Sequence, residues 1–386
     1  MSLLASATGV NSQLADLSNK CIWSAMGVYV LAMFAHMFEW TFGSKGAVAR
    51  RSVEQASLAD AAAAAASPAA AAKKAKKVTV TVAAAGGGTT TLTRTALAGE
   101  GATVVTSGRG DGEQAVDGPG AAGSSERADM FGRIAISLTV LGALLNVAGV
   151  AFRGFSVMRP PWGNMYEFSC AFSLTMVSAY LILLALGKNV RWLGLPAVLA
   201  AALTLGLATS VLYTDSEQLV PALHSYWLAI HVSCAIICGG AFYAAFASTA
   251  AYLGRESYDK RKAAGLPNGP FKIPASVFER MPATPTLDKL SYRINAMVFP
   301  LWTFTIIAGA IWAEAAWGKY WEWDPKETWS FITWVVYAAY LHARATAGWK
   351  GRKAGYLALL AFACFLFNYY GVNIFITGKH SYAGVG

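Results

Sequence analysis

Long apolar runs alternating with short polar segments dominate the hydrophobic pattern of this 386-residue chain. Each of eight runs holds roughly 18 or more residues, the length at which an α-helix can cross a bilayer. Backbone groups in lipid must be hydrogen-bonded within the protein, so only helices or closed barrels span it, and runs this long favour helices. The pattern predicts an all-α, polytopic membrane protein with spans at about 21–42, 130–152, 166–187, 192–212, 225–253, 294–313, 328–347 and 354–376.

Basic residues in short loops set the predicted orientation. Lys and Arg gather at 188–191, 255–262 and 350–353. The positive-inside rule puts these loops in the cytoplasm, which leaves the alternate loops and both termini outside. We therefore interpret the net charge of +10 as a topology signal without a nucleic-acid partner, and expect a multi-pass protein of the plasma (inner) membrane.

A polar insert follows the first span. Residues 45–128 contain an alanine tract, a basic cluster and Gly-rich stretches, with few aromatic residues. Such a segment buries too little apolar surface to offset its ordering entropy, which favours disorder. We expect a first helix with an external N-terminus (1–44), a low-complexity, largely disordered cytoplasmic linker (45–128) and a seven-helix core (129–386) with an external aromatic segment at 314–329.

That aromatic segment lies between the sixth and seventh predicted spans. It contains more Trp and Tyr than the one or two of an ordinary interfacial belt. The spacing of the first three predicts that their rings share one face of a helical turn, with a fourth beside them. Such a shelf suits a large planar ligand with polar edges, for which a porphyrin is the obvious candidate. The residues are Trp317, Tyr320, Trp321, Trp323 and Trp329.

Two of the outer turns also carry helix-start signals. Asn164 followed by Glu167 fits an N-cap and its capping-box acid. Asp324, Pro325 and Glu327 fit an N-cap, a first-turn proline and a capping-box acid. The two acidic residues of the second turn therefore have an alternative structural role, that of starting a helix.

The five histidines separate by predicted depth. His224 and His231 lie at the outer end of the fifth span, and His380 follows the eighth. His342 lies in the seventh span, roughly 25 Å below the outer surface at about 1.5 Å per residue, and His36 reaches a similar inner depth. Ionisable residues inside a membrane are costly, which favours a functional role for them.

Depth also limits which histidines can share a haem iron. Two axial imidazoles lie about 4 Å apart, given metal–nitrogen bonds of about 2 Å. The histidines therefore predict two sites, an outer one beside the aromatic shelf and an inner one within the helices. Histidine pairs hold b-type haem without thioether bonds, and no carboxylate or thiolate cluster completes a zinc or copper site.

Several motifs resemble those of a known family. The segment 317–329 is similar to the tryptophan-rich WWD signature of haem-handling proteins in cytochrome c maturation. The segments at 219–232, 340–344 and 371–382 resemble the outer-histidine, transmembrane-histidine and C-terminal histidine segments of the CcsA family, also called CcsB or ResC. The likeness covers roughly 130–386, and 164–167 fits the family's early loop.

The resemblance implies roles for individual residues. His231 and His380 would be the axial ligands of an outer haem b, and His342 would be one ligand of an inner haem. In this family the second inner ligand comes from a partner, although His36 could supply it or could be a packing residue. The outer haem would lie over the aromatic shelf, for which we expect contacts from Trp317, Tyr320, Trp321, Trp323, Asp324 and Trp329.

The activity implied is that of a haem–apocytochrome c synthase (lyase), working with a ResB-like membrane partner and a thiol-reducing membrane protein. Haem would move from the inner to the outer site, where two thiols of an apocytochrome CxxCH motif join its vinyl groups. The substrate supplies the thiols, so no catalytic residue is assigned in this chain. A haem exporter or chaperone without synthase activity, or a di-haem electron-transfer subunit, remain alternatives.

Overall fold

The structure of the chain is a computed structural model that describes residues 9–65, 76–83, 89–96, 121, 125–219, 225–266 and 273–379. It divides into two units, one formed by Met1–Ser44 with Val116–Gly386 and the other by Lys45–Ala115. The first unit is a helical bundle, and the second contains most of the polar insert.

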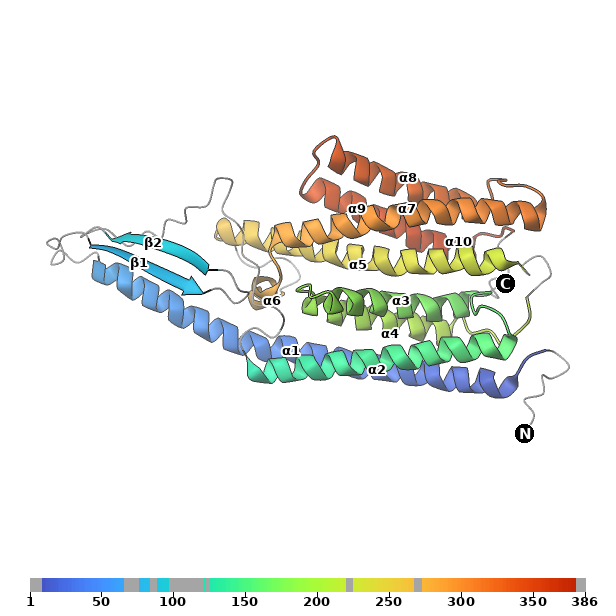
Figure 1. Ribbon diagram of the computed structural model, residues 1–386, viewed down its shortest axis with the longest axis horizontal. Coiled ribbons are helices and arrows are strands. Elements are labelled where there is room, and N and C mark those ends of the chain that lie inside the picture. The colour runs from blue at the N-terminus through green and yellow to red at the C-terminus, as the bar shows by residue number, and fades with distance from the viewer. Residues whose placement is uncertain are drawn as a thin grey trace. The chain divides into compact units, whose positions relative to one another are not determined.

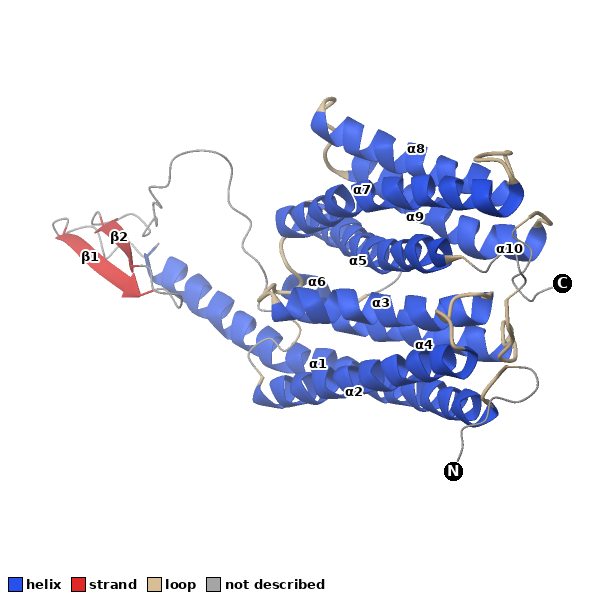
Figure 2. Ribbon diagram, turned by 45° about the vertical axis from the view of Figure 1, so that its right-hand side comes forward, coloured by secondary structure: helices blue, strands red, loops and turns tan. Residues whose placement is uncertain are grey.

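Long antiparallel helices build the bundle (Figure 1). Figures 1 and 2 both show α1 and α2 along one edge, α3 and α4 beside them, and α8 at the opposite edge. Helix α5 is central, because it packs against α3, α7 and α9. The elements are α1 (Ser12–Ala65), α2 (Glu126–Val157), α3 (Met165–Ala185), η2 (Arg191–Leu193), α4 (Gly194–Ser210), α5 (Tyr226–Ala263), α6 (Ala275–Arg280), α7 (Thr284–Trp317), α8 (Pro325–Ala345), α9 (Arg352–Leu366), η4 (Phe367–Gly371) and α10 (Val372–Phe375).

The predicted membrane architecture is confirmed. Within the described residues, seven helices are long and apolar enough to cross a membrane: Ser12–Gly43, Glu126–Val157, Met165–Ala185, Arg191–Ser210, Tyr226–Ala263, Thr284–Trp317 and Arg352–Phe375. The remaining predicted span, at about 328–347, is the 21-residue helix α8, which packs against α7 and α9. It is less apolar than the other seven because Trp, Tyr and charged residues interrupt its sequence.

The two ends of the bundle differ in chemistry. At one end, α5 stops and α9 starts. Two ion pairs lie there, between Arg344 and Asp288 at 2.7 Å and between Arg352 and Glu256 at 2.9 Å. We call this the basic end. At the other end, which we call the aromatic end, α7 stops at Trp317 and α8 begins. The loops that the sequence assigns to opposite faces of the membrane therefore lie at opposite ends of the bundle.

Arg280 joins the two borders of the polar insert at the basic end. Its side chain is buried and donates hydrogen bonds to the carbonyl oxygens of Trp40, in α1, and Ala121, which precedes α2. Its guanidinium also lies 4.5 Å from the centre of the Trp40 ring. One side chain thus fixes both points at which the chain leaves and re-enters the bundle.

The predicted linker at 45–128 contains elements of secondary structure in the part that the structure describes. Helix α1 continues to Ala65, and two antiparallel strands, β1 (Lys76–Ala83) and β2 (Thr89–Ala96), pair from Lys76 with Ala96 to Ala83 with Thr89. Alanine is the strongest helix former, and alternating Val and Thr favour a strand, so the local sequence accounts for both elements. The other residues of the predicted linker, except Ala121 and those from Ser125 on, lie outside the described part of the chain.

Candidate functional site

A large cavity opens at the aromatic end, between α3, α5, α7, α8 and the η4 turn. Its empty volume is about 1320 Å³ when the space open to solvent at its mouth is included. Most of the wall is aromatic. The rings that line it belong to Trp162, Phe168, Trp302, Trp312, Trp317, Trp321, Phe365 and Tyr369.

A cluster of buried rings adjoins this cavity. Phe242 and Tyr337 stack at 4.0 Å with their planes 10° apart. Trp302 and Phe365, which reach up to line the cavity, pack edge-on against each other at 5.6 Å. Trp302 and Phe365 also contact Phe242, so the cavity wall is continuous with a cluster of buried aromatic rings.

His231 lies in the cavity wall, as the sequence predicts for an outer-site residue. Its Nδ1 atom lies 2.8 Å from the backbone carbonyl oxygen of Thr305 in α7. A carbonyl can only accept, so Nδ1 carries the proton and the lone pair is on Nε2. Histidines that bind metals use this arrangement, in which a hydrogen bond from one ring nitrogen fixes the tautomer and ring orientation for coordination by the other.

Gly309 makes room for the His231 ring. A Cβ atom at this position would lie 2.7 Å from Cε1 and 2.9 Å from Nδ1 of the imidazole. The ring also packs at 5.8 Å against Trp312, one turn further along α7. The absence of a side chain at residue 309 therefore allows the imidazole to approach the α7 backbone and reach the carbonyl of Thr305.

The aromatic segment is not the single helical shelf that we predicted. Helix α7 ends at Trp317, because Gly318 adopts a left-handed conformation with φ of 73° and its N–H bonds to the carbonyl of Glu314. Trp317 and Trp321 line the cavity, whereas Tyr320 is 61% exposed. Glycine at this position of a helix end is a common stop signal, and it separates the rings that a continuous helix would have aligned.

Trp323 and Trp329 also lie outside the cavity lining. Trp323 has a left-handed backbone with φ of 60°, and its ring is 65% exposed. It meets Trp321 edge-on at 5.7 Å and Phe331 at 6.3 Å. Trp329 packs against Phe367 at 4.3 Å. Of the five aromatic residues singled out in the sequence, two line the cavity and three do not.

Asp324 and Glu327 form the predicted capping box at the start of α8. The Asp324 carboxylate accepts from the backbone N–H of Lys326 at 3.2 Å, and Glu327 accepts from the N–H groups of Glu322 and Asp324. Asp324 has a further contact, because its Oδ1 atom accepts from the backbone N–H of Lys379 at 2.7 Å. One carboxylate therefore starts α8 and holds the C-terminal segment beside it.

Lys379 is tied to the aromatic segment in two more ways. Its ammonium forms an ion pair with Glu322 and lies 5.9 Å from the centre of the Trp317 ring. Lys379 is the last described residue and immediately precedes His380. His380 itself and His224 lie outside the described residues, so the predicted outer ligand pair is represented by His231 alone.

Lys326 reaches into the cavity from the first turn of α8. Its ammonium donates to the backbone carbonyl of Asn368 at 3.1 Å and lies 5.6 Å from the centre of the Tyr369 ring. It is the only lysine or arginine among the described residues that line the cavity. The sequence analysis did not single it out, although its place beside the capping residue was visible.

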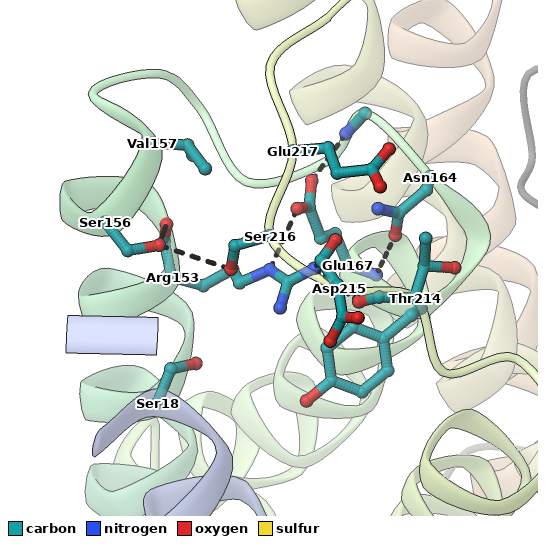
Figure 3. Close-up of polar contacts among 12 residues, drawn as sticks. Ser18, Arg153, Ser156, Val157, Asn164, Glu167, Thr214, Asp215, Ser216 and Glu217 are labelled. Carbon is teal, nitrogen blue, oxygen red and sulfur yellow. Dashed lines mark hydrogen bonds and ion pairs between the residues drawn. The ribbon is translucent and has the colours of Figure 1, made fainter. Parts of the chain in front are cut away.

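A buried ionic cluster supports the mouth of the cavity (Figure 3). The Glu167 carboxylate binds Arg153 at 3.0 Å and Arg159 at 2.8 Å, and accepts from the N–H of Gly163 at 2.8 Å. Arg153 also donates to the carbonyl oxygens of Thr214 and Asp215 in the loop that follows α4. The cluster ties that loop to the start of α3, where Asn164 caps the helix as predicted.

His342 lies near the basic end, at the predicted depth, but its side chain is exposed on the outward face of α8. Its Nε2 atom lies 3.2 Å from the hydroxyl of Thr346. The buried side of α8 is formed by other residues, Thr333, Tyr337, Tyr340 and Ala343, so the His342 side chain does not face the interior of the bundle.

His36 is fully buried and belongs to a different environment. Its Nδ1 atom lies 3.3 Å from Glu39 and its Nε2 atom 3.5 Å from Thr139 in α2. Glu39 in turn binds Arg191 at 2.8 Å. The helices that carry His36 and His342, α1 and α8, lie at opposite edges of the bundle in both views, so the structure does not bring these two histidines together.

Comparison with known proteins identifies relatives of this site. Residues 162–380 match the family described as "Cytochrome C assembly protein", an interval that contains every described cavity-lining residue. The "Cytochrome c biogenesis protein CcsA" of Synechococcus sp. (strain JA-3-3Ab) is 35% identical over 288 residues, which cover 63% of this chain and 83% of that protein. The proteins of the same name from Porphyra purpurea and Marchantia polymorpha are 32% and 34% identical, covering 65% and 58% of this chain and 87% and 78% of theirs.

Proposed function

Because this chain belongs to the cytochrome c assembly protein family and acts in cytochrome c biogenesis, we propose that it carries haem b across the membrane and presents it for attachment to apocytochrome c. The cavity at the aromatic end is the outer haem site. Haem is the substrate here, and the chain works as a subunit of a haem–apocytochrome c synthase with a ResB-like membrane partner. A thiol-reducing membrane protein keeps the apocytochrome cysteines available.

One observation carries this proposal. His231 is held in the wall of a large aromatic cavity with Nδ1 bonded to the Thr305 carbonyl, so that Nε2 is the nitrogen able to coordinate iron. The other groups needed for a porphyrin are present around it. Trp317 and Trp321 offer flat apolar surfaces in the cavity wall.

His380 is the proposed second axial ligand of the outer haem. Support comes from its neighbour, since Lys379 is bound by Asp324 through its backbone and by Glu322 through its ammonium. Both acids belong to the aromatic segment beside the cavity. The Asp324 carboxylate thus has a role beyond starting α8, which is to hold the chain that leads into the ligand.

The inner haem is proposed to lie between His342 and the partner. The exposed side chain of His342 on the outward face of α8 supports a ligand supplied by another chain. His36 is a poor alternative, because both of its ring nitrogens already have partners and its helix lies at the opposite edge of the bundle. In the plasma (inner) membrane, the basic end faces the cytoplasm and the aromatic end faces the outside.

The reaction requires this chain mainly to position the haem. Each substrate thiol adds across one vinyl group, forming a carbon–sulfur bond to one vinyl carbon while the thiol proton goes to the other, so no oxidant or reductant is consumed. The cavity holds the haem plane between aromatic rings, and the histidines keep its iron coordinated until the CxxCH histidine replaces one of them. Proximity and orientation of this kind account for large rate factors without a catalytic side chain.

The visible spectrum of the purified protein, with and without its partner, tests the proposal. We expect low-spin b-type bands, and a c-type pyridine haemochrome after addition of a CxxCH peptide and the partner. Haem that stays bound and only cycles between redox states would instead identify an electron-transfer subunit. Haem that passes to the peptide without thioether bonds would identify a carrier, and a protein without haem in either preparation would contradict the proposal altogether.

A further inference from the structure

We propose that Lys326 binds a carboxylate of the ligand in the cavity, and that it thereby fixes which edge of the haem faces outward. This inference rests on the proposed function, because it assigns an orientation to the same substrate. It concerns the two propionate groups of haem, which occupy one edge of the porphyrin, whereas the reacting vinyl groups lie on other edges.

The position of Lys326 carries the first step. Its side chain lines the cavity and packs over the Tyr369 ring, and its single hydrogen bond among the described residues goes to a backbone carbonyl, that of Asn368. A partly buried ammonium can make three hydrogen bonds. A ligand oxygen in the cavity can provide the acceptors that remain.

The second step concerns charge. Two other lysines of this region, Lys319 and Lys379, each have a carboxylate partner in Glu322. Lys326 has no carboxylate within 4.0 Å among the described residues. Burial disfavours the charged form of Lys326 and the nearby Asp324 carboxylate favours it, and a carboxylate bound in the cavity would favour it further.

The neighbouring acids are already used by the backbone. Asp324 accepts from the N–H groups of Lys326 and Lys379, and Glu327 accepts from those of Glu322 and Asp324. Their geometry is set by the helix cap, so they cannot turn to neutralise the ammonium without undoing the start of α8. Glu327 also lines the cavity, but its carboxylate is bound to backbone N–H groups, so Lys326 is the cationic side chain that the described lining offers to a ligand.

The consequence for the reaction is directional. With one propionate edge drawn to Lys326 in α8 and the iron bound by His231 in α5, two points of the porphyrin are fixed from two different helices. The haem then cannot rotate freely in its plane, which presents the same vinyl groups to each incoming CxxCH motif. A symmetric aromatic slot alone would allow several orientations.

Binding of haem and of haem dimethyl ester to four proteins tests the inference. The wild type should bind haem roughly ten- to a hundredfold more tightly than the ester, as expected for a charge-assisted hydrogen bond in a partly buried site. Lys326→Met should bind both with the affinity of the ester, with its low-spin spectrum intact. Lys326→Arg should keep the preference for haem. Lys319→Met is the matched control, because Lys319 does not line the cavity. This variant should behave as the wild type.

The outcomes separate the two proposals. A Lys326→Met protein that still prefers haem, or a wild type that binds haem and ester alike, would overturn the carboxylate site while leaving haem binding in place. A wild type that binds neither compound with a low-spin spectrum would contradict the proposed function itself. If Lys326→Met binds neither compound, the Lys326→Arg variant provides the test. If this variant binds haem no more tightly than the ester, the role of the positive charge is refuted.

Discussion

The Nδ1 atom of His231 lies 2.8 Å from the carbonyl oxygen of Thr305, although 74 residues separate them in the chain. Gly309, one turn beyond Thr305 on α7, makes this contact possible, because any Cβ atom there would lie 2.7 Å from the imidazole. The orientation of the proposed iron ligand on α5 is therefore set by the backbone of α7, and it can be changed without touching the histidine.

Gly309→Ala should displace the His231 ring while leaving the bundle folded. We expect haem affinity to fall about tenfold or more, since overpacking of this kind costs roughly 1–3 kcal/mol, and we expect the low-spin bands to weaken. Optical titration with haem measures both effects. Gly27→Ala is the control, because nothing lies within 4 Å of a Cβ atom there. In a His231→Gly background the Gly309 substitution should have no further effect, and an additive loss would show that it acts elsewhere.

His231→Ala and His380→Ala should each abolish cytochrome c maturation, because each removes one axial ligand of the outer haem. Excess imidazole should partly restore maturation by filling the vacant coordination position. Covalent haem in a co-expressed apocytochrome provides the measurement. Normal maturation in both variants would refute the ligand assignment, and loss without rescue by imidazole would indicate a structural defect.

Glu167→Gln should destabilise the protein strongly. The substitution leaves Arg153 and Arg159 buried beside a neutral amide, and breaking a buried pair in this way costs about 3–5 kcal/mol. Thermal unfolding in detergent should show a lower midpoint, together with weaker haem binding because residues 162–164 line the cavity. Asp16→Asn, which breaks the exposed pair with Lys20, should leave the midpoint unchanged. Equal midpoints for the two variants would remove the structural role that we assign to the cluster.

Much of the fold follows from local pattern. Span length and loop charge predict the helices and which loops share an end, and the capping box is visible in the four consecutive residues from Asp324 to Glu327. The stop at Gly318 was visible as well, since glycine commonly ends a helix, but the even spacing of aromatic residues suggested a continuous turn instead. The Val–Thr alternation of β1 was hidden by the low complexity around it.

The remaining features depend on contacts between segments far apart in sequence. Glu167 meets Arg153 across a turn and, through it, the loop after α4, which no local pattern encodes. The partners of His36 and the outward direction of His342 likewise follow from which helices become neighbours. Sequence reasoning could place these residues by depth, but it could not decide between the buried and the exposed side of each helix.

Deleting 52–115 with a short Gly-Ser joint should leave haem binding and thermal stability unchanged. The buried Arg280 side chain donates hydrogen bonds to the carbonyl oxygens of Trp40 and Ala121, one on each side of the deleted segment. These contacts hold the two borders in the bundle without the segment between them. Arg280→Met in the full chain should, by contrast, lower the unfolding midpoint. Loss of haem from the deletion variant would show that the insert takes part in the site.

The two inner histidines should respond differently to substitution. His342→Ala should remove the inner haem from the complex with the partner, because it deletes a ligand that faces out of the bundle. His36→Gln should retain that haem, since the His36 side chain contacts Glu39 and Thr139. This substitution should lower only the stability of the protein. Haem content per complex, read from the pyridine haemochrome after purification through the partner, distinguishes the two. Loss of the inner haem in His36→Gln with an unchanged unfolding midpoint would restore His36 as a ligand and require the helices at the two edges of the bundle to approach each other.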